Sequence, residues 1–371
     1  MVQCSAVQII EFCPDPYLHD DADEYVVLNG TGSLDGIMVS DGEGGFRFPA
    51  GAGIDGPIIV ARNALAYEQT HKQLPDYEWY DFSPNVPDVI SGDKIRMANS
   101  HDELILYDHG RIVQSVSWPL EVTCREGQVH YLEQGIWDRR PLLLGQSRFS
   151  PETFGNVTLT AFVSPDHSTD IFLQAIASAH QTIRVNVYEF TSPVLAQALI
   201  DAYQRGVEVW VLVEGGPVGG ISAEEKALIW VMNQSGIPVY QMATVNDRKA
   251  PYRFDHAKYA VIDGRGVLLT SENFGSSGFP LTGTRGNRGW GVYLEDMLLA
   301  QYFEAVYRSD VSGITSIPIA GNPGALESPV SVPYTVEFSP RSISGTTVTP
   351  VIAPDTSYLI LDLLNLSLIH I

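Results

Sequence analysis

The chain has 371 residues, of which 44% are hydrophobic, and a formal net charge of -22. This length predicts more than one domain, and the apolar content is sufficient for sizeable cores. So acidic a chain repels nucleic-acid backbones and anionic lipid surfaces, which excludes a broad basic binding surface and leaves any anionic substrate to a few local cations. The N-terminus shows no basic segment and no apolar run long enough for a signal peptide or a membrane span, so we expect a soluble chain that is cytoplasmic by default.

Three cysteines, Cys4, Cys13 and Cys124, occur at unpatterned spacing. They form neither a Cys-x-x-Cys pair nor an even disulfide framework, so the sequence predicts free thiols.

Residues 8–120 consist of short β-rich runs separated by turn clusters that contain Gly and Asp. Regularly spaced short strands of this kind predict an antiparallel β-sandwich. The order of the runs, EYVVLN, then LDGIMVSDGEGGFRFP, then LILYDHGRIVQSVSW, resembles lamin-tail domains, which are immunoglobulin-like sandwiches. The resemblance implies a binding or targeting module, and no catalytic residue carries over from it.

Residues 121–155 show no sustained period and are predicted to form an irregular connector. From residue 156 to residue 310, buried-strand runs such as TIRVNVYEF and VEVWVLVEG alternate with amphipathic helical segments that end at Gly206 and Gly236. This alternation predicts βαβ units, and therefore an α/β domain whose mostly parallel mixed sheet is flanked by helices.

Residues 311–346 are rich in Ser, Gly, Pro and Thr and are predicted to form a linker or crossover. Beyond them, TPVIAPDTSYLILDLLN at 349–365 echoes TAFVSPDHSTDIFLQAI at 160–176: each has an apolar strand, a Pro-Asp turn and a helix start. The echo predicts that residues 347–365 begin a second repeat of the domain, with a chance strand-turn-helix similarity as the competing interpretation.

The last six residues, LSLIHI at 366–371, are what CTGTCTCTTATACACATC encodes, which is a transposon-adaptor end used in sequencing libraries. Our hypothesis is that these six residues are a sequencing artefact and that the chain is a C-terminally truncated fragment.

The stretch DHAKYAVIDGRGVLLTSENF carries the most specific pattern in the sequence. It places His256, Lys258, Asp263, Ser271 and Asn273 at offsets 0, 2, 7, 15 and 17. Chance produces the His, Lys, Asp and Asn members of this pattern on the order of 2 times in 10,000 chains of this composition. The pattern resembles the H-x-K-x-x-x-x-D signature of the phospholipase D superfamily and favours a cardiolipin synthase-like phosphodiesterase.

The same stretch has a physical interpretation that does not depend on the family. AKYAVI is a predicted strand, so His256 and Lys258, two residues apart, face the same side. A hairpin through residues 263–266 returns VLLTSEN as the neighbouring strand and brings Asn273 beside them. Phosphodiester cleavage needs a nucleophile on phosphorus, donors for the equatorial oxygens and an acid for the leaving oxygen. Neutral His256 can supply the first, and Lys258 with Asn273 the second.

The resemblance implies a phosphohistidine intermediate, no metal or other cofactor, and a second histidine from a second motif as the general acid. No other histidine here is followed two residues later by Lys, so the chain holds one motif. Two explanations are open: a homodimer that pairs two copies of His256, or a missing second phospholipase-D half. The echo at 349–365 and the adaptor-like end favour the missing half, in which case the fragment alone is inactive.

Ser271, Arg288 and Glu189 are predicted to contact substrate. Each has a structural alternative, because Ser271 can cap its strand, Arg288 can lie in a solvated loop and Glu189 can cap the next helix. Asp263 is a catalytic candidate by its place in the motif and equally a turn former or brace.

Two positions depart from the family pattern. Thr270 stands where the family usually has Gly, which narrows the backbone freedom beside Ser271. Gly289 occupies the place, about thirty residues past the histidine, where the family often has a carboxylate that orients the imidazole. Glu295 or Asp296 can substitute only from six or seven residues away, so the orientation of His256 is the open part of the catalytic prediction.

The predicted function is phosphodiesterase or phosphatidyltransferase activity on a phospholipid, with a nuclease of the same superfamily as an alternative. Phospholipid is favoured by family frequency, since the net acidity disfavours nonspecific DNA binding and anionic lipid surfaces alike. An alternative from another class is a binding or scaffold protein, in which the lamin-tail-like domain tethers an inactive phosphodiesterase fold.

Overall fold

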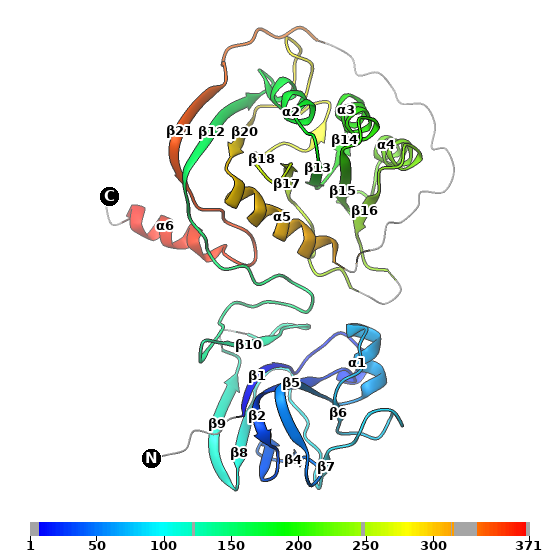
Figure 1. Cartoon of the computed structure of the whole chain (residues 1–371), viewed down its shortest axis with the longest axis vertical. Coiled ribbons are helices and arrows are strands. Elements are labelled where there is room, and N and C mark those ends of the chain that lie inside the picture. Colours follow the sequence, from blue (N-terminus) through cyan, green and yellow to red (C-terminus); the bar gives the residue numbers. More distant parts are fainter. Residues whose placement is uncertain (1–6, 121–122, 246–248, 313, 315–331, 369–371) are drawn as a thin grey trace. The chain divides into compact units, whose positions relative to one another are not determined.

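The computed structural model of the chain describes residues 7–120, 123–245, 249–312, 314 and 332–368. The chain divides into two compact units, Met1–Gln146 and Ser147–Ile371 (Figure 1). No helix within the described residues is long and apolar enough to cross a lipid bilayer. Cys13 and Cys124 are free thiols, as predicted, and Cys4 lies outside the described residues.

The first unit contains two β-sheets. Its strands are β1 (Gln8–Cys13), β2 (Tyr25–Ser33), β3 (Ile37–Ser40), β4 (Gly45–Arg47), β5 (Gly53–Ala61), β6 (Tyr77–Glu78), β7 (Ile90–Ser91), β8 (Asp102–Asp108), β9 (Arg111–Trp118), β10 (His130–Glu133) and β11 (Ile136–Trp137). One sheet has the order β11-β10-β1-β2-β5-β6, and the other has the order β7-β4-β3-β8-β9. A 3-10 turn at His19–Asp21 and helix α1 (Ala64–His71) lie between strands.

Apolar residues from both sheets of this unit build one core. Phe12 of β1 and Leu28 of β2 belong to the same buried cluster as Val39 of β3 and Leu106 of β8. Two sheets that share one core agree with the predicted sandwich architecture, because inward-facing residues of both sheets interdigitate in such folds. The immunoglobulin-like, lamin-tail-like character of the unit stays a prediction.

The second unit is built on an eight-stranded mixed sheet. Its strands are β12 (Phe154–Ser164), β13 (Thr182–Val187), β15 (Glu208–Glu214), β16 (Val239–Met242), β17 (Lys258–Ile262), β18 (Gly266–Thr270), β20 (Gly289–Glu295) and β21 (Arg341–Val348). Their order in the sheet is β16-β15-β13-β17-β18-β20-β12-β21. A separate small sheet pairs β14 (Phe190–Thr191) with β19 (Phe274–Gly275).

The prediction of a mostly parallel sheet needs correction. Only the pairings of β13 with β15 and of β15 with β16 are parallel, whereas every other pairing in the eight-stranded sheet is antiparallel. Parallel neighbours require a crossover connection, and here α3 and α4 provide it. The short loop between β17 and β18 can join only antiparallel strands.

Helices cover both faces of this sheet. α2 (Ser168–Ala177), α3 (Pro193–Gln204) and α4 (Ala223–Gln234) lie along one face, and α5 (Met297–Val311) lies against the other (Figure 1). α3 begins where Ser192 caps it and proline takes the first helical position, and Asp296 caps α5 by accepting from the Leu299 N–H. α6 (Tyr358–Leu368) follows β21.

The unit boundaries differ from those predicted. The connector predicted at 121–155 contains β10 and β11, and the linker predicted at 311–346 contains most of β21. β21 reads RSISGTTV, and its side chains are mostly exposed, so it lacks the apolar alternation that marks a strand. α6 extends through Leu368, whereas residues 369–371 lie outside the described residues, so the artefact hypothesis for 366–371 stays a prediction.

Candidate active site

His256 lies two residues before the first residue of β17, at the open end of the β17–β18 hairpin. The two strands are antiparallel, with Ile262 opposite Gly266 and Tyr259 opposite Leu269, which confirms the predicted hairpin. His256 is exposed and lines a cavity of 340 Å³ that also borders Lys258. Aromatic and acidic side chains make up much of the remaining wall of this cavity: Tyr252, Phe254, Asp255, Tyr259, Phe303 and Asp310.

The imidazole of His256 packs against Tyr188, the first residue after β13. The two rings meet edge to face, with their centroids 4.7 Å apart. Desolvation lowers the pKa of His256, and the neighbouring ammonium of Lys258 lowers it further. A lowered pKa keeps the imidazole neutral near pH 7, and the neutral form is the one that can attack phosphorus.

Lys258 begins β17 with its side chain buried. Its Nζ donates a hydrogen bond to the backbone oxygen of His256 at 3.0 Å and lies 5.3 Å from the centre of the Tyr188 ring. Desolvation lowers the pKa of Lys258, while Asp255, Glu272 and Glu189 oppose that shift. Lys258 forms no salt bridge with any residue that the structure describes, so its ammonium can receive an anionic ligand.

Asn273 and Glu189 contact each other directly. Nδ2 of Asn273 donates to Oε2 of Glu189 at 3.1 Å, and the pairing of β14 with β19 holds the adjacent residues side by side. Oδ1 of Asn273 is buried without a hydrogen-bond partner among the described residues. A buried oxygen without a hydrogen bond costs about 1–3 kcal/mol, so Oδ1 is suited to accept a hydrogen bond from a ligand. The negative charge of Glu189 also raises the pKa of Lys258, so this carboxylate lies near both the Asn273 amide and the Lys258 ammonium.

Ser271 directly follows β18, at the end of the strand where β18 pairs with β20. Its Oγ accepts from the Trp290 N–H at 3.0 Å, and its own N–H donates to the Trp290 carbonyl oxygen at 2.9 Å. Thr270 donates its hydroxyl to the same carbonyl at 3.0 Å. This geometry agrees with the structural alternative for Ser271, a strand cap, and the substrate contact stays a prediction.

Asp263 lies at the opposite end of β17 from His256, in the turn that joins β17 to β18. Its carboxylate accepts three backbone N–H groups, from His180 at 2.9 Å, Gln181 at 2.7 Å and Thr182 at 2.8 Å. Desolvation alone would raise the pKa of Asp263, but these hydrogen bonds outweigh it and lower the pKa. The carboxylate therefore braces the start of β13, as the structural alternative for Asp263 expects, and a direct catalytic role stays a prediction.

Arg288 is already engaged within the protein. Its Nη1 donates to Oδ2 of the fully buried Asp166 at 2.9 Å, and its Nη2 donates to the Tyr334 hydroxyl at 2.9 Å. The guanidinium also lies over the Phe338 ring, 5.4 Å from its centre. These contacts tie the segment before β21 to the start of α2, and the substrate contact of Arg288 stays a prediction.

Gly289 leaves room for a neighbouring carboxylate. A Cβ added at Gly289 would collide with Cγ, Cδ and Oε1 of Glu272. Glu272 thus occupies the space of the missing side chain, and its Oε2 accepts from Asn287 Nδ2 at 3.1 Å. The displaced substitutes do not reach this region, since Glu295 ends β20 at its far end and Asp296 caps α5.

Sequence reasoning missed two buried acids in the His256 cavity. Asp255 precedes His256 and is 8% exposed, and its Oδ2 is buried without a hydrogen-bond partner among the described residues. Asp310 of α5 accepts from Asn186 Nδ2 at 3.3 Å. Desolvation raises the pKa of Asp255 to about 7 and that of Asp310 to about 8. The adjacency of Asp255 to the motif was a visible signal, whereas nothing local marks Asp310.

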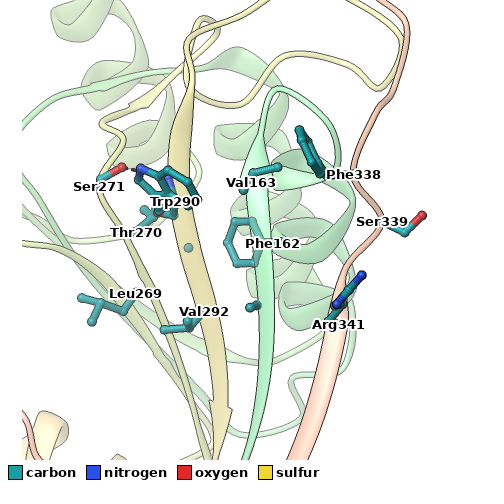
Figure 2. Close-up of a pocket in the computed structure, with 12 residues that line it drawn as sticks. Phe162, Val163, Leu269, Thr270, Ser271, Trp290, Val292, Phe338, Ser339 and Arg341 are labelled. Carbon is teal, nitrogen blue, oxygen red and sulfur yellow. Dashed lines mark hydrogen bonds between the residues drawn. The ribbon is translucent and has the colours of Figure 1, made fainter.

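An apolar groove of 630 Å³ lies beside this cavity. Figure 2 shows Leu269, Trp290 and Val292 on one side of it, and Phe338 and Arg341 on the other. Leu269 lines both the groove and the His256 cavity. The two spaces therefore share one wall residue.

A cluster of possible metal ligands occurs in the first unit. Glu78, Asp81 and Asp88 bring ligand atoms within 4.8 Å of one another. Glu78 already accepts hydrogen bonds from the backbone N–H groups of Ala64 and Ser83, so its carboxylate is used in holding the loop. The cluster lies outside the unit that carries His256.

Comparison with known families places this motif in context. Residues 172–311 match the family model for "Cardiolipin synthase, PLD-like domain", and this range contains His256, Lys258 and Asn273. The match supports assignment of this segment to the phospholipase D superfamily and to a phosphodiesterase-type fold. A search of curated proteins found no match.

Several solved structures are similar in fold. A phospholipase D family member, Nuc from Salmonella typhimurium, is 24% identical, with 46% of this chain and 99% of that chain covered and a TM-score of 0.37. NucT from Helicobacter pylori is 18% identical, with 45% and 100% covered and a TM-score of 0.36. Phosphatidylserine synthase from Haemophilus influenzae Rd KW20 is 15% identical, with 43% and 40% covered and a TM-score of 0.34. No activity is transferred from these three to the chain.

Proposed function

We propose that the second unit is a phosphodiesterase that works through a covalent intermediate on His256. The neutral imidazole attacks phosphorus and forms an N–P bond, while the bond from phosphorus to the leaving oxygen breaks and that oxygen takes a proton from a general acid. Water or an alcohol then gives a proton back to the deprotonated general acid and attacks phosphorus, and the N–P bond breaks to release His256, which gives hydrolysis or transfer.

The observation that carries the proposal is the shared cavity of His256 and Lys258. A nucleophile with a lowered pKa and an ammonium without a salt bridge among the described residues border one space, and Tyr188 contacts both. Lys258 and the second Nδ2 hydrogen of Asn273, the one that Glu189 does not accept, are suited to stabilise the equatorial phosphoryl oxygens as charge accumulates there. Glu189, which accepts from Asn273, orients that amide.

A phospholipid is the substrate that these surroundings favour. The wall of the His256 cavity itself includes the apolar side chains of Phe254, Leu269 and Phe303. An acyl chain fits such a wall, whereas the net charge of -22 does not separate the two substrate classes, because it repels a nucleic-acid backbone and an anionic lipid surface alike. The description of the matching family, a cardiolipin synthase-like domain, points the same way.

The general acid belongs to a second phospholipase-D half. The chain has one H-x-K motif, and the leaving oxygen of an ordinary phosphodiester needs a proton donor. A second H-x-K-x-x-x-x-D motif about 190 residues beyond His256, near position 445, would supply it, as the spacing of the sequence echo suggests. A homodimer that pairs two His256 residues is the alternative source.

An activated substrate tests the role of His256 without the second half. The leaving group of bis(p-nitrophenyl) phosphate departs without protonation, so the chain should release a burst of about one nitrophenolate per molecule in the presence of EDTA. The phosphorylated protein should be acid-labile and base-stable, as a phosphohistidine is. His256→Asn should abolish the burst, and His19→Asn, an exposed histidine of the first unit, should leave it unchanged. No burst, or an equal burst in His256→Asn, would refute the proposal.

A scaffold function is the second candidate, and one observation favours it. The His256 ring accepts or donates no hydrogen bond within the described part of the chain, and Gly289 supplies no carboxylate to orient it. If the burst is absent while His256→Asn leaves phospholipid binding intact, this alternative replaces the enzymatic one.

A further inference from the structure

A second sequence echo accompanies the one between 160–176 and 349–365. Phe149-Ser150-Pro151 recurs as Phe338-Ser339-Pro340, at the same offset of 189 residues that relates Asp166 to Asp355. The segment that leads into β12 and the segment that leads into β21 are therefore also counterparts.

The two aspartates hold these leading segments in a crossed arrangement. Oδ1 of Asp166 accepts from the Phe338 N–H at 2.9 Å, and Oδ1 of Asp355 accepts from the Phe149 N–H at 2.5 Å. Both aspartates are fully buried. Asp166, which follows β12, thus binds the segment that leads into β21, and Asp355, which follows β21, binds the segment that leads into β12. Adding 189 to the residue numbers of Asp166 and Phe149 gives Asp355 and Phe338, so the two bonds are equivalent.

The pairing of β12 with β21 obeys the same exchange. The hydroxyl groups of Thr160 and Ser342 lie 2.7 Å apart, and those of their counterparts Thr349 and Thr153 lie 2.8 Å apart. Val157 pairs with Thr346, which is its own counterpart in sequence. In a twofold interface every contact occurs twice, once between two residues and once between their counterparts. The reciprocal contacts of β12 and β21 therefore relate these two antiparallel strands by a twofold axis.

The counterpart of α2 is left uncovered. Phe172 and Ala175 of α2 are buried in the core at 0% and 4% exposure, whereas their counterparts in α6, Leu361 and Leu364, are 62% and 55% exposed. β21 also stands last in the order of its sheet, whereas β12 has β20 on its other side. α6 and β21 therefore present the core side of an α2-like helix and the free edge of a β12-like strand.

The twofold relation also identifies what the groove fits. Phe149 packs against Tyr302 of α5, with ring centroids 5.5 Å apart. Its counterpart Phe338 is 55% exposed and lines the groove of Figure 2. Under the same axis, the helix that covers Phe338 is the second copy's counterpart of α5.

We infer that residues 338–368 are the opening strand, turn and helix of a second copy of the fold in residues 149–312, that the two copies interlock through Asp166 and Asp355, and that the groove seats the second copy's counterpart of α5. This deepens the proposed function by placing its second half. The interlock rests on hydrogen bonds that are independent of catalysis, so a failure of the burst assay leaves it standing.

Amide hydrogen exchange on the chain tests the interlock. Asp166→Asn should speed exchange at Glu337 and Phe338 by on the order of tenfold or more, and Asp355→Asn should do so at Phe149, each with little change at the other segment. Asp170→Asn, a half-exposed carboxylate of α2, is the matched control and should change neither segment. Unchanged exchange at Phe149 in Asp355→Asn, or at Phe338 in Asp166→Asn, overturns the interlock.

A cysteine reporter tests the occupant of the groove. Phe338→Cys should react readily with a maleimide in the chain, and at least about tenfold more slowly when a copy of residues 178–312 is fused after Leu366, which continues the 189-residue offset. Phe82→Cys, exposed in the first unit, should react equally in both. Unchanged labelling in a fusion that unfolds cooperatively overturns the assignment, as does protection of the unfused chain by phosphatidylcholine vesicles, which would make the groove a lipid seat. If the fusion does not fold, the exchange experiment decides.

Discussion

The Tyr188 ring fixes the imidazole of His256 from one side, and the backbone holds that ring in turn. The two rings meet at 4.7 Å between centroids, and the Tyr188 hydroxyl accepts a hydrogen bond from the Val218 N–H at 2.8 Å. Edge-to-face contacts of this kind contribute about 0.5–1.5 kcal/mol beyond burial. Packing therefore orients the His256 imidazole in a site where Gly289 provides no carboxylate for that purpose.

Replacing Tyr188 should separate the contribution of its ring from that of its hydroxyl. Tyr188→Leu removes the edge-to-face contact, so we expect the burst rate with bis(p-nitrophenyl) phosphate to fall by about 10- to 100-fold. Tyr188→Phe keeps the ring and loses only the hydrogen bond from Val218, so its rate should stay within about threefold of the original. Stopped-flow absorbance measures both, and equal losses in the two variants would show that the ring contact does not orient His256.

The pH dependence of His256 should follow the charge of Lys258. The lowered pKa of His256 means that the reactive neutral form persists to a more acidic pH than for an ordinary histidine. Lys258→Met removes the positive charge that disfavours imidazolium, so the pKa of His256 should rise and its transition should move to higher pH. Titration of the His256 ring proton by NMR measures this directly, with Lys249→Met as a control for loss of one lysine. A pKa that is unchanged or lower in Lys258→Met contradicts the assigned cause.

Asp310 should make the second unit less stable as the pH rises. Its pKa is about 8 in the folded state, from an ordinary value of 3.8, so the folded state holds a proton that the unfolded chain releases between these values. The stabilisation that this proton provides is complete below about pH 4 and is lost as the pH rises toward 8. Each pKa unit corresponds to about 1.4 kcal/mol, and the nearby Asp255 shares the titration.

Asp310→Asn cannot ionise, so its unfolding free energy should fall less between pH 5 and pH 8 than that of the unsubstituted chain, by about 1–3 kcal/mol. Urea denaturation at the two pH values measures this difference. Asp201→Asn, an exposed carboxylate of α3, should reproduce the original pH slope. If Asp310→Asn has the original slope as well, the buried proton does not reside on Asp310.

The sequence predicted correctly the β17–β18 hairpin, which depends on the spacing of neighbouring residues. The β17–β18 hairpin needed only two strand runs and a turn, so its presence followed directly from the stretch that contains His256. Two side-chain roles depended on distant partners instead: Asp263 accepts from residues 81 to 83 positions away, and Arg288 binds Asp166, 122 positions away. No period or motif in a single chain announces such partners.

The same reason explains the strand that was missed. β21 is an edge strand of small polar residues, and its existence depends on pairing with β12 at a sequence separation of more than 180 residues. The sequence overestimated the number of parallel strand pairs, because the crossover helices α3 and α4 lie only between β13, β15 and β16. Long-range pairing therefore decided both features against the local pattern.

Asp263 should prove a structural residue when it is replaced. Its carboxylate accepts three N–H groups, and its φ of 51° lies in the left-handed region that alanine disfavours. Asp263→Ala should lower the unfolding free energy by about 2–4 kcal/mol, whereas Asp263→Asn, which tolerates this backbone conformation, should cost less. Urea denaturation gives both values, and the burst amplitude per folded molecule should stay the same. A stable Asp263→Ala variant without a burst would restore the direct catalytic role.

Arg288 provides the clearest separation between a structural cation and a substrate cation. Its partner Asp166 is fully buried, so Arg288→Ala leaves a buried carboxylate without its compensating charge, and removal of one partner of such a pair typically costs about 3–5 kcal/mol. The guanidinium is itself about half-exposed and two backbone N–H groups still bind Asp166, so we expect a smaller loss of unfolding free energy than that. Arg285→Ala, an exposed neighbour, should be nearly neutral.

Kinetics then distinguish the two roles of Arg288. If the guanidinium only ties Tyr334 and Asp166 together, the substrate concentration at half-maximal burst rate in Arg288→Ala should stay within about threefold of the original once the protein is folded. A phosphate ligand would instead weaken substrate binding by about tenfold or more, because a charge-assisted hydrogen bond contributes about 1.5–3 kcal/mol. A large loss of binding with unchanged stability would therefore return Arg288 to the substrate site.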